Sequence, residues 1–362
     1  MMLELTYRCN FKCKHCYIPG SYKKKFRQEL NTKQIFSILD QLQELGCLYL
    51  GLTGGEPFLR EDIFKILGYA KKKGFQIIIY TNGSLIDEDK AQRLQRLSPN
   101  KVDITIPAVS KDIFERITGL KGSREKVFEA ISILHRNGVR LGVKSCMLKG
   151  NENEINGIQD FAASLGIPYR LDTMLSRCLD GSDEPFGYRA EIERVTSAPV
   201  PPKADPPTAG LQCSRKTPPG ECGVTDNGEL FKCGVGKSQA AITPYGELKM
   251  CLMIDYPGYK ILNRGVPSAR CPVPSTQYPV SSNPASQSPS KKDGLEKAWG
   301  KLKGLVAGIK PDKNYQCDKC AVSQYCRWCP ATAWLYNKSF TSCVPETLNR
   351  AEQGKRGYEY RG

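Results

Sequence analysis

Three cysteines lie close together near the start of the chain, in the stretch TYRCNFKCKHCYIPG, at Cys9, Cys13 and Cys16. Cysteine thiolates bind zinc and iron–sulfur clusters. A four-iron cubane normally takes four cysteine ligands, but the next cysteine is Cys47. Two interpretations follow. The loop is either a structural zinc or disulfide knuckle, or it holds a cluster with one metal atom left open for a further ligand.

The numbers of cysteine and histidine residues limit the kinds of metal site that the chain can form. The chain has 16 cysteines among 362 residues but only two histidines, His15 and His135. Two histidines are too few for histidine-rich zinc catalysis, and they make a facial-triad iron site or a Ser-His-Asp triad improbable. Without a signal peptide, so many cysteines favour thiolates used as ligands over a disulfide scaffold. No run of about 18 apolar residues is present, so we expect a cytoplasmic protein with no membrane contact.

The chain carries a formal net charge of +16. Clustered Lys and Arg can bind nucleic acid, but the lysines lie mostly in stretches that resemble helices, such as YAKKKG, where a solvated face explains them. A basic binding module interleaved with aromatic residues does not stand out, so we do not expect nucleic acid as a partner. An acidic peptide partner is compatible with the charge.

The first half of the chain alternates short apolar runs with amphipathic stretches, a pattern typical of repeated βα units and a parallel sheet. Six strands are expected, at Leu3–Tyr7, Leu48–Thr53, Gln76–Tyr80, Val102–Ile106, Val139–Cys146 and Tyr169–Thr173. Helices are expected at Thr32–Leu45, Glu61–Lys73, Asp87–Leu97, Arg124–Asn137 and Glu152–Leu165. Several of them end at a glycine suited to a helix C-cap: Gly46, Gly74, Gly138 and Gly166.

This regularity favours a barrel or an open α/β sheet, whose active site lies at the carboxyl ends of the strands. The Cys9–Cys16 loop follows the first expected strand and therefore lies at that edge. Two later segments, 197–210 and 266–294, are rich in Pro and Ser and cannot hold a helix or a central strand. We interpret them as linkers or surface insertions.

The C-x3-C-x2-C spacing of Cys9, Cys13 and Cys16 resembles the signature of the radical S-adenosylmethionine (radical SAM) family, which lies on the loop after the first strand. His15 holds the position where that family prefers an aromatic residue near adenine. A second family motif, TGGEP at Thr53 to Pro57, closes the second expected strand. Taken alone it is a strand-to-helix turn. The resemblance implies a four-iron cluster held by the three cysteines, with S-adenosylmethionine on the open iron.

The resemblance also assigns residues to the cofactor. In the family, the backbone of the glycines, here Gly54 and Gly55, and the carboxylate of the glutamate, here Glu56, engage the amino group of the cofactor's methionine. Asn82 and Thr105 resemble further contacts, to its ribose or carboxylate. The implied reaction is reductive cleavage to a 5'-deoxyadenosyl radical, which takes a hydrogen atom from the substrate. A one-electron donor such as ferredoxin or flavodoxin would reduce the cluster.

The cysteines past residue 210 resemble the SPASM extension of radical SAM enzymes. That resemblance implies two auxiliary four-iron clusters. One would be ligated by Cys317, Cys320, Cys326 and Cys343, and the other by Cys233, Cys251, Cys329 and an upstream cysteine, Cys222 in preference to Cys213. One departure is visible: two residues separate Cys326 from Cys329, where the family has three. A zinc site built by Cys317, Cys320, Cys326 and Cys329 is the alternative that spacing permits.

The expected organisation is a partial (β/α)6 TIM-like barrel at 1–190, a Pro-rich linker at 191–221 and a small Cys-rich SPASM domain at 222–350. The last carries the insertion 266–294, and a basic tail follows at 351–362.

The expected function is modification of a peptide or protein side chain, because SPASM members mostly act on peptidyl substrates. We expect no leader-binding domain before the first expected strand, which either weakens the case for a peptide substrate or means that a separate protein supplies such a domain. A sulfatase-maturing enzyme and an enzyme of small-cofactor biosynthesis are alternatives within the family. The alternative from another class is a non-catalytic iron–sulfur electron carrier. A carrier needs clusters in which every iron has a protein ligand, so the three-cysteine loop argues against it.

Overall fold

A computed structural model describes residues 1–20, 22, 28–173, 175–190, 228, 230–262, 294–326 and 328–359. Its described part contains one sheet of nine strands, in the order β6-β5-β4-β3-β2-β1-β7-β8-β9. The first six strands are parallel. They are β1 (Met2–Glu4), β2 (Tyr49–Thr53), β3 (Gln76–Thr81), β4 (Lys101–Thr105), β5 (Leu141–Cys146) and β6 (Tyr169–Asp172). The predicted α/β class with a parallel sheet is confirmed.

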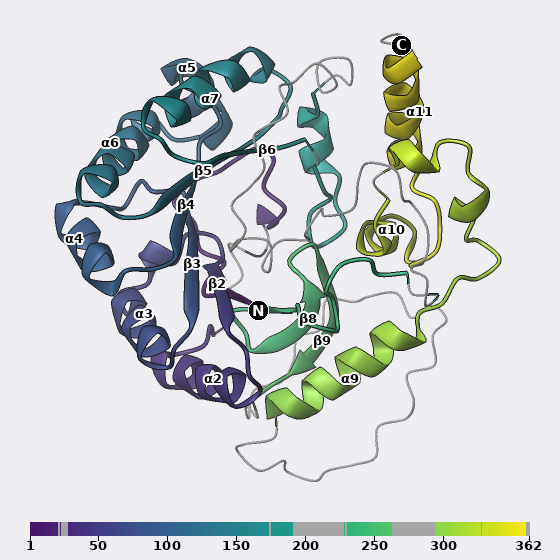
Figure 1. Cartoon of the computed structure of the whole chain (residues 1–362), viewed down its shortest axis with the longest axis horizontal. Coiled ribbons are helices and arrows are strands. Elements are labelled where there is room, and N and C mark those ends of the chain that lie inside the picture. Colours follow the sequence, from purple (N-terminus) through teal and green to yellow (C-terminus); the bar gives the residue numbers. More distant parts are fainter. Residues whose placement is uncertain are drawn as a thin grey trace.

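Helices connect these strands and cover one face of the curved sheet (Figure 1). They are α2 (Thr32–Glu44), α3 (Ile63–Lys72), α4 (Glu88–Leu97), α5 (Lys111–Thr118), α6 (Ser123–Arg136) and α7 (Ile155–Ser164). Short 3₁₀ turns lie at Pro57–Leu59, Glu152–Glu154, Glu184–Tyr188, Cys317–Lys319 and Ser323–Tyr325. Local sequence sets the helix ends. At the start of α2, Asn31 Oδ1 accepts from Gln34 N at 3.0 Å, and Gln34 Oε1 accepts from Asn31 N, which forms a capping box.

Glycines in the left-handed conformation follow the helices as expected, at Gly46, Gly74, Gly138 and Gly166. The α5 helix, which was not predicted, ends in the same way at Gly119. Strand β1 ends earlier than the expected Leu3–Tyr7. Leu5, the residue after it, still donates its N–H to Thr53 O of β2, but Thr6 accepts from Gly55 N in the turn that follows β2.

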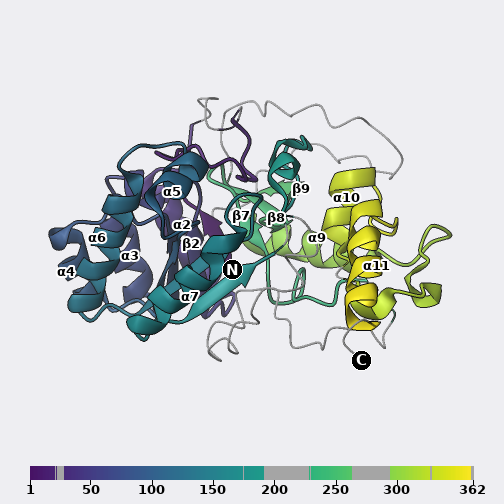
Figure 2. The ribbon, with the colours of Figure 1, turned by 90° about the horizontal axis from the view of Figure 1, so that it is seen from above.

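The sheet continues with three strands from the C-terminal half of the chain. They are β7 (Ala241–Ile242), β8 (Glu247–Cys251) and β9 (Ile254–Lys260). Strand β7 pairs parallel with β1, and β8 and β9 follow antiparallel. The helices α9 (Gly294–Gly308), α10 (Pro330–Asn337) and α11 (Pro345–Glu359) lie beside this end of the sheet, away from α3 to α7 (Figure 2). The Pro-rich segments lie outside the described residues, except for Gly294, the first residue of α9.

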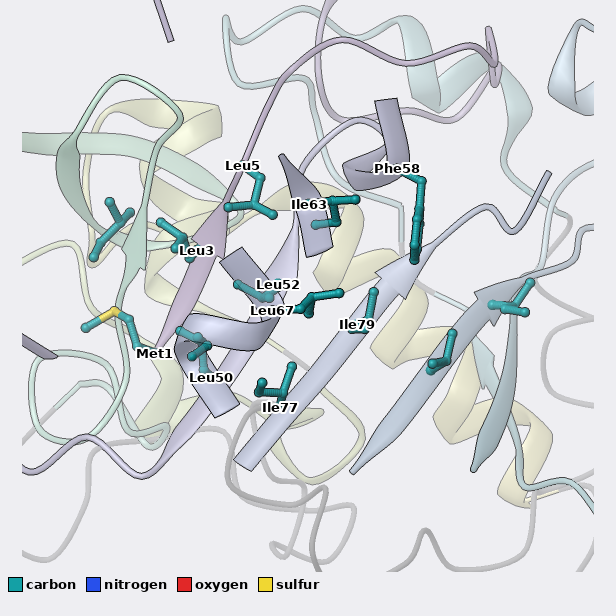
Figure 3. Close-up of a cluster of buried hydrophobic side chains, with 14 of the residues drawn as sticks. Met1, Leu3, Leu5, Leu50, Leu52, Phe58, Ile63, Leu67, Ile77 and Ile79 are labelled. Carbon is teal, nitrogen blue, oxygen red and sulfur yellow. The ribbon is translucent and has the colours of Figure 1, made fainter. Parts of the chain in front are cut away.

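A layer of apolar side chains between the sheet and the helices forms the main core (Figure 3). Alternate residues of each strand point into it, as the period of two requires. From β2 and β3 these are Leu50, Leu52, Ile77 and Ile79, which face Ile63 and Leu67 of α3. Strands that are buried on both faces usually read as continuous apolar runs. Here the opposite face carries a small apolar cluster around Ile78 and Tyr80 of β3, but also polar residues, including Glu4, Asp103 and Lys144, and these mark it as the face for function.

Within the described residues, every helix is too short or too polar to span a lipid bilayer.

Candidate active site

The three-cysteine loop leaves the sheet after β1 and is fastened to the end of α5. Lys12 N donates to Thr118 O at 2.8 Å, and Lys14 N donates to Ile117 O at 3.2 Å. Gly119 keeps this contact close, because a Cβ there would lie 3.1 Å from Lys12 O. Cys9, Cys13 and Cys16 are all partly exposed thiols. The loop therefore presents three soft ligands at the carboxyl edge of the sheet, where the sequence predicted the chemistry.

The donor set suits an iron–sulfur cluster. No group of three or more Cys, His, Asp or Glu side chains in the described part of the chain is arranged around the position of a single metal ion. A cubane distributes its cysteine ligands over different irons, so its ligands do not converge on one atom. Three thiols on one loop, with no disulfide among the described cysteines, fit such a cluster.

The Gly54–Gly55 turn lies directly against the start of this loop. Gly55 N donates to Thr6 O at 2.7 Å, and Glu56 N donates to Arg8 O at 2.8 Å. A Cβ on Gly54 would lie 2.2 Å from Thr6 O, and Gly54 has a φ of +142°. A Cβ on Gly55 would lie 2.2 Å from Arg8 O. Both positions need glycine because two backbone segments meet there.

Glu56 places a buried carboxylate beside the loop. Its Oε1 accepts from Thr81 Oγ1 at 2.8 Å and from Phe58 N at 3.0 Å, and its Oε2 accepts from Asn82 N at 2.8 Å. Burial raises the pKa of Glu56 to about 7, although these three donors oppose the shift. Within the described residues, no Lys, Arg or His forms an ion pair with it. A cationic ligand would satisfy this carboxylate.

Asn82 and Thr105 lie at the ends of neighbouring strands. Asn82 Nδ2 donates to Asn10 Oδ1 at 2.9 Å and lies 3.9 Å from Cys9 Sγ. The structure therefore brings Asn82 to both Glu56 and the cysteine loop. Thr105 is the last residue of β4 and lies in register with Lys144 of β5. Among the described residues, the side chain of Thr105 forms no hydrogen bond to the loop.

A buried ionic network behind the loop was not predicted. Lys249 Nζ of β8 lies 2.8 Å from Glu4 Oε2 and 3.3 Å from Asp255 Oδ1. The hydroxyls of Tyr7 and Tyr17 donate to Glu4 at 3.1 and 3.4 Å, and burial raises the pKa of both tyrosines well above the usual value. The signal in the sequence is a charged residue between apolar neighbours, Glu4 in MLELT and Lys249 in ELKMC.

The segment after β6 also packs on the loop, which sequence reasoning missed. Leu179 N donates to Tyr17 O at 2.9 Å, and Cys178 Sγ lies 3.4 Å from Cys16 O. Cys178 is buried, as free cysteines often are.

Three of the C-terminal cysteines come together although they are distant in sequence. Burial raises the pKa of Cys251 to about 12, and the nearby thiols of Cys329 and Cys233 add to the shift. The pKa of Cys329 is raised in the same way, with Cys233 again among the causes. This is the grouping expected for one auxiliary cluster. The expected fourth ligand, Cys222, and its alternative Cys213 lie outside the described residues.

The members of the other expected set lie before and after α10 in the sequence. Cys317, Cys320 and Cys326 flank two 3₁₀ turns, and Cys343 is exposed just before α11. Cys320 N donates to Cys317 O at 3.2 Å. Cys329, which the alternative zinc site would share with this set, lies with Cys233 and Cys251.

An α/β sheet whose first loop carries C-x3-C-x2-C beside a G-G-E-P turn is the architecture of a radical SAM domain. Residues 3–162 match the family model described as Radical SAM superfamily, so this part of the chain is a radical SAM domain. Such a domain uses a four-iron cluster and S-adenosylmethionine as cofactors.

Individual relatives share this domain. Fe-coproporphyrin III synthase of Methanosarcina barkeri is 29% identical over 165 residues, which are 46% of this chain and 41% of the relative. PqqA peptide cyclase of Gluconobacter oxydans is 29% identical over 166 residues, 46% of each chain. The matched segment thus spans less than half the length of these relatives.

Two solved structures resemble the whole chain. Streptococcus suis SuiB bound to precursor peptide SuiA has a TM-score of 0.64 at 15% identity, covering 96% of this chain and 75% of SuiB. Native anSMEcpe with bound AdoMet and Cp18Cys peptide has a TM-score of 0.66 at 14% identity, covering 99% of this chain and 96% of that one. At this identity the likeness establishes the fold, including the C-terminal half.

Proposed function

We propose that the chain is a radical SAM enzyme that removes a hydrogen atom from a side chain of a peptide or protein substrate. The observation that carries the proposal is the buried Glu56 carboxylate, held by three donors beside the Cys9 loop and without a basic partner in the described residues. An electron carrier has no use for such a carboxylate. A cofactor that carries an ammonium group gives it a partner.

Each residue has a defined part in this proposal. Cys9, Cys13 and Cys16 hold the cluster, Glu56 receives the amino group of the cofactor's methionine, and the close approach of Gly54 and Gly55 to Thr6 and Arg8 fixes the distance between turn and loop. When bound, the cofactors supply hydrogen-atom abstraction. The protein orients the substrate and keeps water away from the reacting carbon.

Two auxiliary clusters complete the proposal. Cys233, Cys251 and Cys329 hold one together with Cys222, and Cys317, Cys320, Cys326 and Cys343 hold the other. Bound there, such clusters would supply an acceptor for the electron that remains after hydrogen abstraction, or a position for a substrate thiolate. Burial around Cys251 and Cys329 supports the first set, because a buried site excludes solvent and tunes the reduction potential.

The peptide substrate is supported by the relatives. PqqA peptide cyclase acts on a peptide by its name, and SuiB was crystallised with a precursor peptide. The second candidate is synthesis of a small cofactor, which the names Fe-coproporphyrin III synthase and AdoMet-dependent heme synthase support. Both candidates share the first half of the reaction and differ only in what loses the hydrogen atom.

The test is anaerobic reconstitution followed by dithionite and S-adenosylmethionine. We expect release of 5'-deoxyadenosine, and Cys13→Ala abolishes it. Cys47→Ala is the matched control, since Cys47 lies before β2 at the opposite end of that strand from the Gly54 turn. Absence of 5'-deoxyadenosine from the wild-type protein would overturn the proposal and favour an electron carrier.

A further inference from the structure

Three polar side chains form a closed ring of hydrogen bonds between the cysteine loop and the turn after β3. Asn82 Nδ2 donates to Asn10 Oδ1 at 2.9 Å, Asn10 Nδ2 donates to Ser84 Oγ at 2.8 Å, and Ser84 Oγ donates to Asn82 Oδ1 at 2.7 Å. All three residues are half-buried. Asn10 directly follows Cys9, so the ring fastens the first thiol of the loop to the end of the third strand.

The backbone fixes the direction of every bond in this ring. Ser84 N donates to Asn82 Oδ1 at 2.9 Å. A backbone N–H can only donate, so the amide atom that faces it is the oxygen of Asn82. The Nδ2 of Asn82 therefore faces Asn10, which presents its own oxygen to Asn82 and its Nδ2 to Ser84. Gly83 allows this tight turn, because its φ is +80°.

Asn82 has one donor left after the ring is closed, and Cys9 lies beside it. The amide nitrogen carries two hydrogens, and one of them goes to Asn10. The same nitrogen lies 3.9 Å from Cys9 Sγ, and Phe11 N donates to that sulfur at 3.4 Å. A cysteine that binds metal is a thiolate, and a charged acceptor forms a stronger hydrogen bond than a neutral one. One side-chain donor and one backbone donor therefore converge on Cys9.

The protein uses the full hydrogen-bonding capacity of the Asn82 amide. Its oxygen accepts from Ser84 N and Ser84 Oγ, and its nitrogen donates to Asn10 and to Cys9. The backbone N–H of Asn82 is also used, because it donates to Glu56 Oε2. The resemblance to radical SAM enzymes assigned Asn82 to the ribose or carboxylate of S-adenosylmethionine. These hydrogen bonds direct its side chain to Cys9 instead.

We propose that the ring of Asn10, Asn82 and Ser84 raises the reduction potential of the cluster on the cysteine loop, through the hydrogen bond from Asn82 to Cys9. A donor on a ligating sulfur stabilises the additional negative charge of the reduced cluster. Asn82 acts through Cys9, and Asn10 and Ser84 hold its amide in place, so all three are positioning residues. This inference rests on the proposed function, which puts the cluster on Cys9, Cys13 and Cys16.

A redox titration of the reconstituted full chain, followed by electron paramagnetic resonance, tests the ring without turnover. S-adenosylmethionine is left out of the titration and added at its end, where the signal that it shifts identifies the cluster of the cysteine loop. Asn82→Leu keeps the size of the side chain but removes the donor. At the wild-type midpoint potential, we expect the ratio of reduced to oxidised cluster to fall about tenfold, which corresponds to a midpoint lower by about 59 mV.

Variants of Ser84 test the positioning role, because Ser84 belongs to the ring but does not contact Cys9 through it. Ser84→Ala removes the hydroxyl that orients Asn82, and we expect the same ratio to fall about threefold. Ser84→Thr keeps a hydroxyl and should retain the wild-type ratio.

Asn100→Ala is the matched control at the opposite end of β3, where Asn100 Oδ1 accepts from Ile77 N at 3.0 Å. This variant loses a comparable hydrogen bond between a side chain and the backbone. It should therefore lower stability and leave the ratio of reduced to oxidised cluster unchanged.

Three results would overturn the ring's role. They are an unchanged ratio in both Asn82→Leu and Ser84→Ala, an equal fall in Asn100→Ala, and an equal fall in Ser84→Ala and Ser84→Thr. Weaker binding of S-adenosylmethionine by Asn82→Leu at an unchanged potential would assign Asn82 to the cofactor instead. If Asn82→Leu does not bind the cluster, the two Ser84 variants decide.

The two proposals fail separately. If the wild-type protein binds the cluster but releases no 5'-deoxyadenosine, the proposed function fails whatever the titration shows. If 5'-deoxyadenosine is released and the ring variants keep the wild-type potential, the enzyme stands and the role of the ring falls.

Discussion

Lys249 Nζ lies 2.8 Å from Oε2 of Glu4, and neither side chain has any solvent exposure. Glu4 ends β1, and Lys249 lies on β8, two residues before Cys251. Tyr7 and Tyr17, from the two ends of the cysteine loop, donate to the same carboxylate. This ion pair therefore joins the radical SAM loop to the strand that leads into the C-terminal cysteines.

Removal of one partner of this pair should be strongly destabilising. Lys249→Met leaves Glu4 buried without its cation, and we expect a loss of roughly 3–5 kcal/mol in the free energy of unfolding. Glu4→Gln combined with Lys249→Met should lose clearly less than the sum of the single changes, because no uncompensated charge is left. Urea unfolding of the two single variants and the double variant gives the coupling energy.

The partly exposed pair Lys73–Asp40, at 2.6 Å, is the matched control for that experiment. Lys73→Met should change stability by less than about 1 kcal/mol, since water screens the pair. If Lys249→Met and Lys73→Met had similar effects, burial would not be what makes the Glu4 pair strong.

Glu56 should make stability depend on pH. The pKa of its carboxyl is raised from 4.5 to about 7 in the folded protein, so the folded state binds the proton more tightly than the unfolded state. The free energy of unfolding therefore falls as pH rises from about 4.5 to about 7, by up to about 3 kcal/mol, in the protein without cofactor. Glu56→Gln removes this contribution, so the variant gains stability relative to wild type across that interval. Denaturant unfolding at a series of pH values measures the difference.

The same carboxylate should govern how cofactor binding depends on pH. An ammonium group placed beside Glu56 favours the ionised form. Binding of S-adenosylmethionine to the reconstituted protein should therefore strengthen as pH rises from 5.5 to 7, and this rise should be absent in Glu56→Gln. An unchanged pH profile in the variant would remove Glu56 from the cofactor site.

Gly55→Ala should displace the turn from the cysteine loop. The added Cβ would lie 2.2 Å from Arg8 O, and this carbonyl belongs to the backbone of the cysteine loop, which cannot move aside easily. We expect a loss of about 1–3 kcal/mol and incomplete iron loading at the loop. The control is Gly68→Ala in α3, where a Cβ meets nothing within 4 Å. That change should stabilise the protein by about 0.5–1 kcal/mol and leave iron content unchanged.

The parallel sheet was predictable because its signals are local. Runs of apolar residues and glycine caps located all six strands and five helices within a few residues. The eight-residue helix α5 was missed between β4 and the expected helix at Arg124, where a single amphipathic repeat is too short to stand out. The first strand ended earlier than expected, because residues after Leu5 bond the Gly54 turn rather than extend the sheet.

The long-range part of the site could not be predicted. Strand β7 pairs with β1 across more than two hundred residues of sequence, and a two-residue strand has no period to detect. The Glu4–Lys249 pair depends on that pairing, and so does the approach of Cys251 to the other thiols. Motif spacing predicted which residues carry the chemistry at Cys9 to Cys16 and Glu56.

Iron content should separate the auxiliary cysteines from the incidental ones. The wild-type chain should bind about twelve irons after anaerobic reconstitution if three four-iron clusters form. Cys329 lies with Cys233 and Cys251 in a buried group, so Cys329→Ala should reduce the content to about eight and leave the spectrum of the other clusters in place. Cys47→Ala should bind as much iron as wild type, because Cys47 Sγ bonds only the carbonyl of Tyr49 among its described neighbours. About four irons in wild type, with zinc in addition, would show instead that the C-terminal cysteines hold zinc and that the open cluster is the chain's only one.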